Sequence, residues 1–205
     1  AMDELWAFKV DYCFVEEDLT SPTEPLPFDG ETVTIYNGTP PLNDALAWGL
    51  QRFALAGLEI PRLASATFTV QSDFCDDIRA HYLRTEDGVE LEFCMDEQAA
   101  CRDEDCNEIL PSWRAVVLHE IAHAWLDTHL DVIDIERFLD HVGVDAWRDP
   151  DLPWDENGLE HAADTIAWGL MDRDIEMLRV GQPSDDQLAE GFRMLTGIDP
   201  LPRDG

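Results

Sequence analysis

Apolar and polar residues alternate along much of the first half of the chain, a pattern typical of β-strands with one buried face. Between residues 64 and 71, for example, Ala66, Phe68 and Val70 alternate with polar neighbours. The same period of two predicts strands over these ranges: 5–15, 32–36, 64–71 and 89–95. Residues 16–31 are rich in Pro, Glu, Asp and Thr, and we predict a loop there.

A helical period replaces the alternation in the second half of the chain. One earlier helix is predicted over residues 42–57, with an apolar stripe formed by Leu42, Ala45, Leu46, Leu50, Phe53 and Ala54. The later helices are predicted over 112–130, 132–142, 157–180 and 185–196. No repeat or linker divides the chain, so we expect a single domain over residues 1–205. Strands with one helix, followed by helices alone, indicate an α+β fold with a small mixed sheet.

The charge of the chain excludes several kinds of partner. Asp and Glu number 45 against 13 Lys and Arg, which gives a net charge of −32. Such a charge repels phosphate backbones and anionic lipids, so we expect neither nucleic acid nor a membrane surface as a partner. Hydrophobic residues make up 45% of the chain, which excludes a disordered acidic tail. We expect a monomeric globular protein.

Four of the five cysteines lie close together in an acidic region, at Cys75, Cys94, Cys101 and Cys106. Disulfides, free thiols and a thiolate zinc site are the possible interpretations. The spacing lacks the paired short gaps of thiolate zinc sites and favours disulfides. The most local pairing is Cys75 with Cys94 and Cys101 with Cys106. Disulfides predict an extracytoplasmic protein. If Met2 is the native start and Ala1 a cloning remnant, the absence of a signal-like segment predicts a cytoplasmic one.

Residues 119–123 read His-Glu-Ile-Ala-His in an apolar, helix-forming context. On a helix, His119 and His123 lie one turn apart and project from the same face, so both imidazoles can bind one cation. Neutral imidazole nitrogens suit Zn²⁺, which we expect as the cofactor. Glu120 is rotated by about 100°, too far to bind the ion but able to reach its bound water as a general base. Two core histidines with nothing bound are the alternative.

A catalytic zinc site needs a third protein ligand and leaves its fourth position to water. Glu160 is one candidate; it lies beside an apolar helical stripe formed by Leu159, Ala163, Ile166 and Leu170. Asp164, one turn further on, can accept a hydrogen bond from the non-ligating nitrogen of a zinc-bound histidine. His129 is the alternative third ligand, although the helix turn that it requires normally contains a glycine that this chain lacks. His161 is a poorer candidate, because it points away from the face of Glu160.

At these residues the sequence resembles the zincin metallopeptidases, whose active-site helix carries His-Glu-x-x-His. The segment Glu-His-Ala-Ala-Asp at 160–164 resembles the second motif of their thermolysin-like branch, the gluzincins. The sequence is also similar to short actinobacterial metallopeptidases with a Trp-Pro-rich turn between two such helices. The resemblance covers roughly residues 112–170 and implies a minimal zincin-like fold, with Glu160 as zinc ligand and Asp164 orienting the first histidine. It also implies that an edge strand, which we expect at 89–95, binds extended peptide.

The sequence therefore predicts a zinc metalloendopeptidase that acts on a peptide or protein. Its metal ligands are His119, His123 and Glu160, and its general base is Glu120. Two alternatives are a zincin-like module that binds zinc and a partner without turnover, and a zinc hydrolase that acts on a non-peptide amide.

Overall fold

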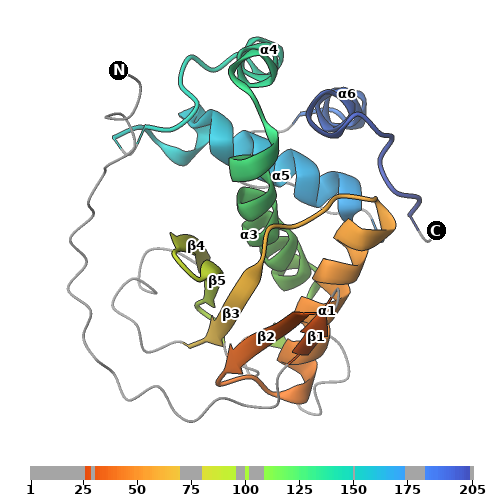
Figure 1. Cartoon of the computed structure of the whole chain (residues 1–205). Helices are drawn as coiled ribbons and strands as arrows, with labels where there is room; N and C mark the ends of the chain where they lie inside the picture. The colour runs from red at the N-terminus through yellow and green to blue at the C-terminus, as the bar shows by residue number, and fades with distance from the viewer. Residues whose placement is uncertain are drawn as a thin grey trace.

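The structure is a computed structural model, and it describes residues 26–28, 31–69, 80–95, 100–101, 109–149, 151–173 and 183–203. The predicted α+β class is confirmed: a mixed sheet and one helix lie on one side of a central helix, and the C-terminal helices lie on the other (Figure 1). The central helix, α3 (Pro111–His129), contains the His-Glu-Ile-Ala-His motif. The strand predicted at 5–15 lies outside the described residues.

The sheet has five strands in the order β1-β2-β3-β5-β4. Their bounds are β1 Leu26–Phe28, β2 Glu31–Tyr36, β3 Leu63–Phe68, β4 Ala80–Thr85 and β5 Gly88–Phe93. The strands β2, β3 and β5 correspond to the predicted strands and run parallel to one another, whereas β1 and β4 are antiparallel to their neighbours. The prediction of a loop over residues 16–31 is wrong for residues 26–28, which form β1 and pair with β2. Residues 16–25 lie outside the described part.

The prediction that residues 89–95 form an edge strand is wrong. β5 lies inside the sheet, hydrogen-bonded to β3 on one side and to β4 on the other. The edge strand beside α3 is β4, which the alternation rule missed because its residues show no period of two: one is buried, three are half-buried and two are exposed. A strand paired on both sides cannot accept a peptide by strand addition, so this role cannot belong to β5.

Helix boundaries follow the capping residues closely. The helices besides α3 are α1 Pro40–Leu55, α4 Val132–Val142, α5 Gly158–Leu170 and α6 Asp185–Thr196. α4 and α6 end where predicted, because Gly143 and Gly197 adopt positive φ values of 75° and 74° at their C-termini. α6 begins with a capping box between Ser184 and Gln187. Among the described residues, no helix combines the length and apolar character needed to cross a bilayer.

α5 is shorter than predicted and ends at Leu170, not at residue 180. Met171 leaves the helix in an extended conformation, and residues 174–180 lie outside the described part. Arg52 of α1 binds the carbonyls that the helix end leaves free: its Nε lies 2.5 Å from Leu170 O and its Nη2 lies 3.2 Å from Met171 O. The C-terminus of α5 is therefore fixed by a side chain distant in sequence, which periodicity could not reveal.

Replacing Arg52 by Met is expected to lower the free energy of unfolding by about 1–3 kcal/mol, because it removes two charge-assisted hydrogen bonds from part-buried carbonyls. The matched control is Arg137→Met on α4, where the lost ion pair with Asp134 is exposed and 4.0 Å long. The control should change stability by less than about 0.5 kcal/mol. Urea unfolding measures both. Equal losses in the two variants would mean that Arg52 does not hold α5.

The hydrophobic core is continuous from the sheet to the C-terminal helices. The predicted stripe of α1 is buried except for Ala54, which is exposed and was wrongly included. The predicted stripe of α5 is buried throughout. α5 and α6 approach so closely that a Cβ on Gly169 would lie 2.1 Å from the ring of Phe192. Glycine is therefore needed at this crossing, where α6 packs closely against α5.

Cys94 and Cys101 are both disulfide-bonded. Cys75 and Cys106 lie outside the described residues, so the pairing stays a prediction. Cys101 also forms an antiparallel bridge with Ile109 just before α3. The cysteine region therefore adjoins the start of the motif helix.

Candidate metal centre

The two histidines of the motif lie in the middle of α3, where the helix is packed between α1 and α5. They are buried, with exposed fractions of 6% for His119 and 5% for His123. Their Nε2 atoms are 3.0 Å apart, and their rings meet edge to face at 87°. The spacing of one helical turn thus brings two nitrogen lone pairs to one point, as the sequence predicts.

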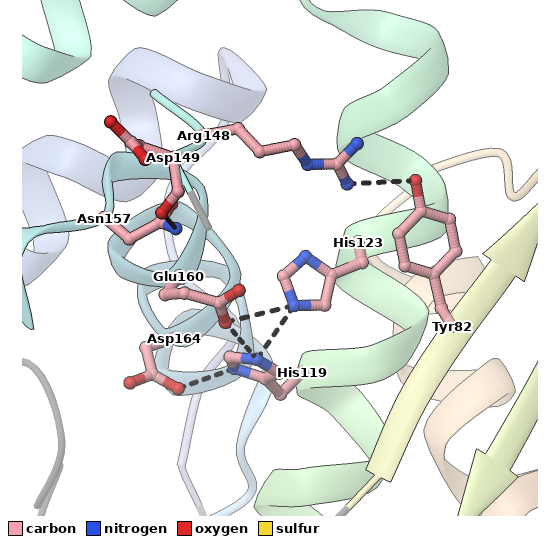
Figure 2. A network of polar contacts seen from close by, with 8 residues as sticks. All are labelled: Tyr82, His119, His123, Arg148, Asp149, Asn157, Glu160 and Asp164. Atoms are coloured by element: carbon pink, nitrogen blue, oxygen red, sulfur yellow. Dashed lines mark hydrogen bonds and ion pairs between the residues drawn. The ribbon is translucent and has the colours of Figure 1, made fainter. Parts of the chain in front are cut away.

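Glu160 reaches the same point from α5 (Figure 2). Its Oε2 lies 3.1 Å from Nε2 of His119 and 3.3 Å from Nε2 of His123. Two ligands of a tetrahedral zinc ion lie about 3.3–3.4 Å apart, because zinc bonds to nitrogen and oxygen measure about 2.0–2.1 Å. The three atoms therefore form a triangle close in size to one face of a zinc tetrahedron, and the donor set fits this ion.

Asp164 lies one turn after Glu160 and holds the other nitrogen of His119. Its Oδ1 is 2.7 Å from His119 Nδ1, and the pair is buried. Because an ionised carboxylate only accepts hydrogen bonds, Nδ1 donates to Asp164, and Nε2 is the nitrogen that faces the centre and can offer a lone pair to a metal once its own proton has left. The structure thus places Asp164 where the sequence predicted it.

The two alternative ligands point elsewhere. His129 stands at the exposed end of α3, where its ring stacks on Trp125 at 4.7 Å and its Nδ1 lies 2.9 Å from Trp125 O. His161 lies on α5, with its Nε2 2.8 Å from Asp155 O. Among the described residues, the side chains whose ligand atoms lie within 4.8 Å of one another are His119, Glu120 and His123. The Oε2 atom of Glu160 joins them through its contacts of 3.1 and 3.3 Å with the two Nε2 atoms, whereas His129 and His161 have no such contact. The structure therefore brings Glu160, and not these histidines, to the centre.

Glu120 lies beside the triangle and is buried, with an exposed fraction of 4%. One of its carboxylate oxygens lies within 4.8 Å of the ligand nitrogens of both histidines. Glu160 contacts both nitrogens at 3.1 and 3.3 Å and closes the triangle, and Glu120 supplies a second carboxylate close to the same two nitrogens. That Glu120 acts on a ligand of the metal, and not as a ligand itself, stays a prediction from its angle on the helix.

The electrostatics of the centre favour a bound cation. Burial would lower the pKa of His119, but the charge and hydrogen bond of Asp164, together with Glu160 and Glu120, raise it to about 10. Burial would raise the pKa of Glu160, but its contacts with the two histidines hold that pKa well below its usual range. The centre thus holds one positive charge among carboxylates. In the metal-free protein a proton on His119 supplies this positive charge, and a divalent cation can replace that proton.

Two aromatic residues that the sequence analysis did not assign to the site flank the imidazoles. Tyr82 of β4 stacks on His123 with ring centroids 5.5 Å apart, and Trp154 stacks on His119 at 5.4 Å. Trp154 lies in a short 3-10 helix (Trp154–Glu156) before α5. Neither Tyr82 nor Trp154 lies at a fixed distance in sequence from the histidines that a known motif would specify. The Trp-Pro-rich turn was the only sequence signal for one of them.

A hollow of about 290 Å³ lies between the β4–β5 hairpin and α3, and none of the residues of the centre lines it. Its walls are the β4–β5 hairpin, Pro61 and Arg62, and one face of α3 at Ala124, Asp127 and Thr128. Tyr82 lines the hollow and also stacks on His123, so its ring lies between the hollow and that histidine.

Comparisons of the chain with protein-family models, with curated proteins and with solved structures gave no match.

Proposed function

We propose that the chain is a zinc-dependent metallopeptidase whose metal is held by His119, His123 and Glu160. The observation that carries the proposal is the triangle of two Nε2 atoms and one carboxylate oxygen, with sides of 3.0, 3.1 and 3.3 Å. Three lone pairs this close would repel one another, so the triangle needs a positive charge: a proton on His119 in the metal-free protein, and the metal ion when it is bound. Two histidines and one glutamate also form a set that catalytic zinc sites use, with the fourth position left for water.

The other side chains have the positions that hydrolysis requires. Zinc bound at such a site lowers the pKa of its water towards 7 and polarises a carbonyl group. In this proposal Glu120, whose carboxylate lies within 4.8 Å of both ligand nitrogens, accepts a proton from the attacking water and passes it to the departing amine. Asp164 fixes the tautomer and orientation of His119 through the 2.7 Å contact at Nδ1. The proton transfer and the orientation of the ligand are thus both assigned to buried carboxylates, those of Glu120 and Asp164.

The substrate we propose is a peptide in extended conformation along β4. This strand is the sheet edge beside α3, and it takes the role that the sequence analysis gave to residues 89–95. The hollow between the β4–β5 hairpin and α3 is large enough for a substrate side chain. An edge strand and an adjacent hollow together support a peptide more than a small amide.

The direct test is hydrolysis of an unstructured protein such as casein by protein loaded with one equivalent of zinc. We expect cleavage that a chelator abolishes and added zinc restores. Protein that binds zinc but cleaves neither casein nor a broad peptide pool would favour the alternative function, a non-catalytic zinc-binding module. One observation favours that alternative: the hydroxyl of Tyr82 donates to Asp127 and is not offered to a substrate.

Zinc uptake at pH 7–8 is expected to release about one proton, because the pKa of His119 is raised to about 10 and the metal-free protein is protonated there. Apparent zinc affinity should therefore rise about tenfold per pH unit, and this dependence should disappear above pH 10. Calorimetric titrations in buffers of different protonation enthalpy measure the released proton. Uptake that releases no proton at pH 7 would contradict the charge balance described for the centre.

A further inference from the structure

The two proposed zinc ligands on α3 are held in different ways. His119 has a carboxylate partner for its Nδ1, at 2.7 Å. The Nδ1 of His123 is buried and has no hydrogen-bond partner among the described residues. Metal-binding histidines almost always donate this second N–H to an acceptor, which fixes the plane of the ring. The orientation of His123 must therefore come from another contact.

That contact is the ring of Tyr82. It lies against His123 with centroids 5.5 Å apart and planes only 15° from parallel. His123 is 5% exposed, so the stacked ring closes one face of a buried imidazole. An offset stack of this kind restricts rotation about the last side-chain bond of the histidine, which is the motion that a hydrogen bond at Nδ1 would otherwise restrict.

Tyr82 is itself anchored at both ends, as Figure 2 shows in part. Its backbone belongs to β4, and its hydroxyl donates a hydrogen bond to Asp127, one helical turn after His123 on α3. Arg148 donates to the same hydroxyl at 3.4 Å. Its neighbour Asp149 accepts a hydrogen bond from Asn157, at the start of α5. The ring is thus tied to the sheet, to the motif helix and to the segment that leads into the helix of Glu160.

We propose that Tyr82 is a positioning residue that fixes the ring of His123 for metal binding, in place of the missing acceptor at Nδ1. The proposal rests on the proposed metal site and deepens it. A phenol has a single proton, and Tyr82 uses it in a hydrogen bond to Asp127. The residue therefore acts through its ring and not as a hydrogen-bond donor to a substrate. The edge strand thereby takes part in the metal centre without supplying a ligand.

The test compares Tyr82→Leu with Tyr82→Phe in the full-length protein. Leu removes the stacked ring, whereas Phe keeps it and removes only the hydroxyl. Tyr36→Leu is the matched control, because Tyr36 is a half-buried tyrosine at the other side of the sheet, on β2. Zinc affinity is measured by competition with a chromophoric chelator. We expect Tyr82→Leu to weaken affinity about 10–100-fold, the usual effect of losing a group that orients a ligand. Tyr82→Phe should stay within about threefold of wild type, as should Tyr36→Leu.

A second measurement decides the proposal without any metal. In the metal-free protein, the imidazole ring signals of His123 in a histidine-labelled NMR sample should form one sharp set in the wild type and in Tyr82→Phe. In Tyr82→Leu they should broaden or double, because the ring samples more than one orientation. Unchanged affinity and a single sharp set in Tyr82→Leu would overturn the proposal. A wild type that binds no zinc would instead refute the proposed function, and the NMR comparison would still decide the role of Tyr82.

Discussion

Replacing Glu120 by Gln is expected to lower kcat/KM for peptide hydrolysis by about 10²–10⁴-fold, the range that a positioned general base contributes. The amide has nearly the shape of the carboxylate but cannot accept a proton from water. Because Glu160 supplies the oxygen that contacts both imidazole nitrogens, the variant should keep one zinc per chain. Cleavage of a quenched fluorescent peptide pool, together with elemental analysis of the same sample, measures both effects.

The matched control for this variant is Glu136→Gln, an exposed glutamate on the next helix, α4, that has no contact with the centre. It should cleave the pool at the wild-type rate. A Glu120→Gln variant with wild-type activity would remove Glu120 from the mechanism. A variant that loses its zinc would show that Glu120 is a ligand and not the base.

Replacing Glu160 is expected to have the largest effect on metal affinity. The zinc dissociation constant should rise by about 10²–10³-fold in Glu160→Ala, if the binding free energy of a structural zinc site is shared among its ligands. Asp164→Asn should cost about 10–100-fold, because it weakens only the support of His119. The order of the two effects separates a ligand from the residue that orients one.

His129→Ala is the control for the Glu160 variants. Its ring stacks on Trp125 at the exposed end of α3, so zinc affinity should not change. Competition with a chelator, as for Tyr82, measures all three variants. Loss of zinc in His129→Ala, with retention in Glu160→Ala, would mean that the third ligand has been assigned to the wrong residue.

Elements defined by local signals could be predicted from the sequence. α6 and α4 have the bounds that periodicity gave, because Ser184 and Asp131 cap their starts and glycines with positive φ end them. β4 and the end of α5 could not be predicted in this way. β4 is an edge strand beside a helix and buries no regular face, and α5 ends where Arg52, from another helix, binds its carbonyls.

The same distinction applies to the candidate site. The positions of His119, Glu120 and His123 follow from one helical turn, so a single segment of sequence contained them. Glu160 could be named from its own helix, but its approach to the two imidazoles depends on how α5 packs on α3. Tyr82 contacts His123 only because β4 lies beside α3 in the folded chain. Stacking partners of this kind carry no spacing rule that could identify them beforehand.

The central claim is that one zinc ion is bound by two imidazoles and a carboxylate. X-ray absorption at the zinc K-edge, on wild-type protein loaded with one equivalent of zinc, tests it most directly. We predict a first shell of nitrogen and oxygen at about 2.0–2.1 Å, with the outer-shell scattering of two imidazoles and no sulfur. A shell dominated by sulfur at about 2.3 Å would place the metal on cysteines and contradict the account, as would protein that takes up no zinc.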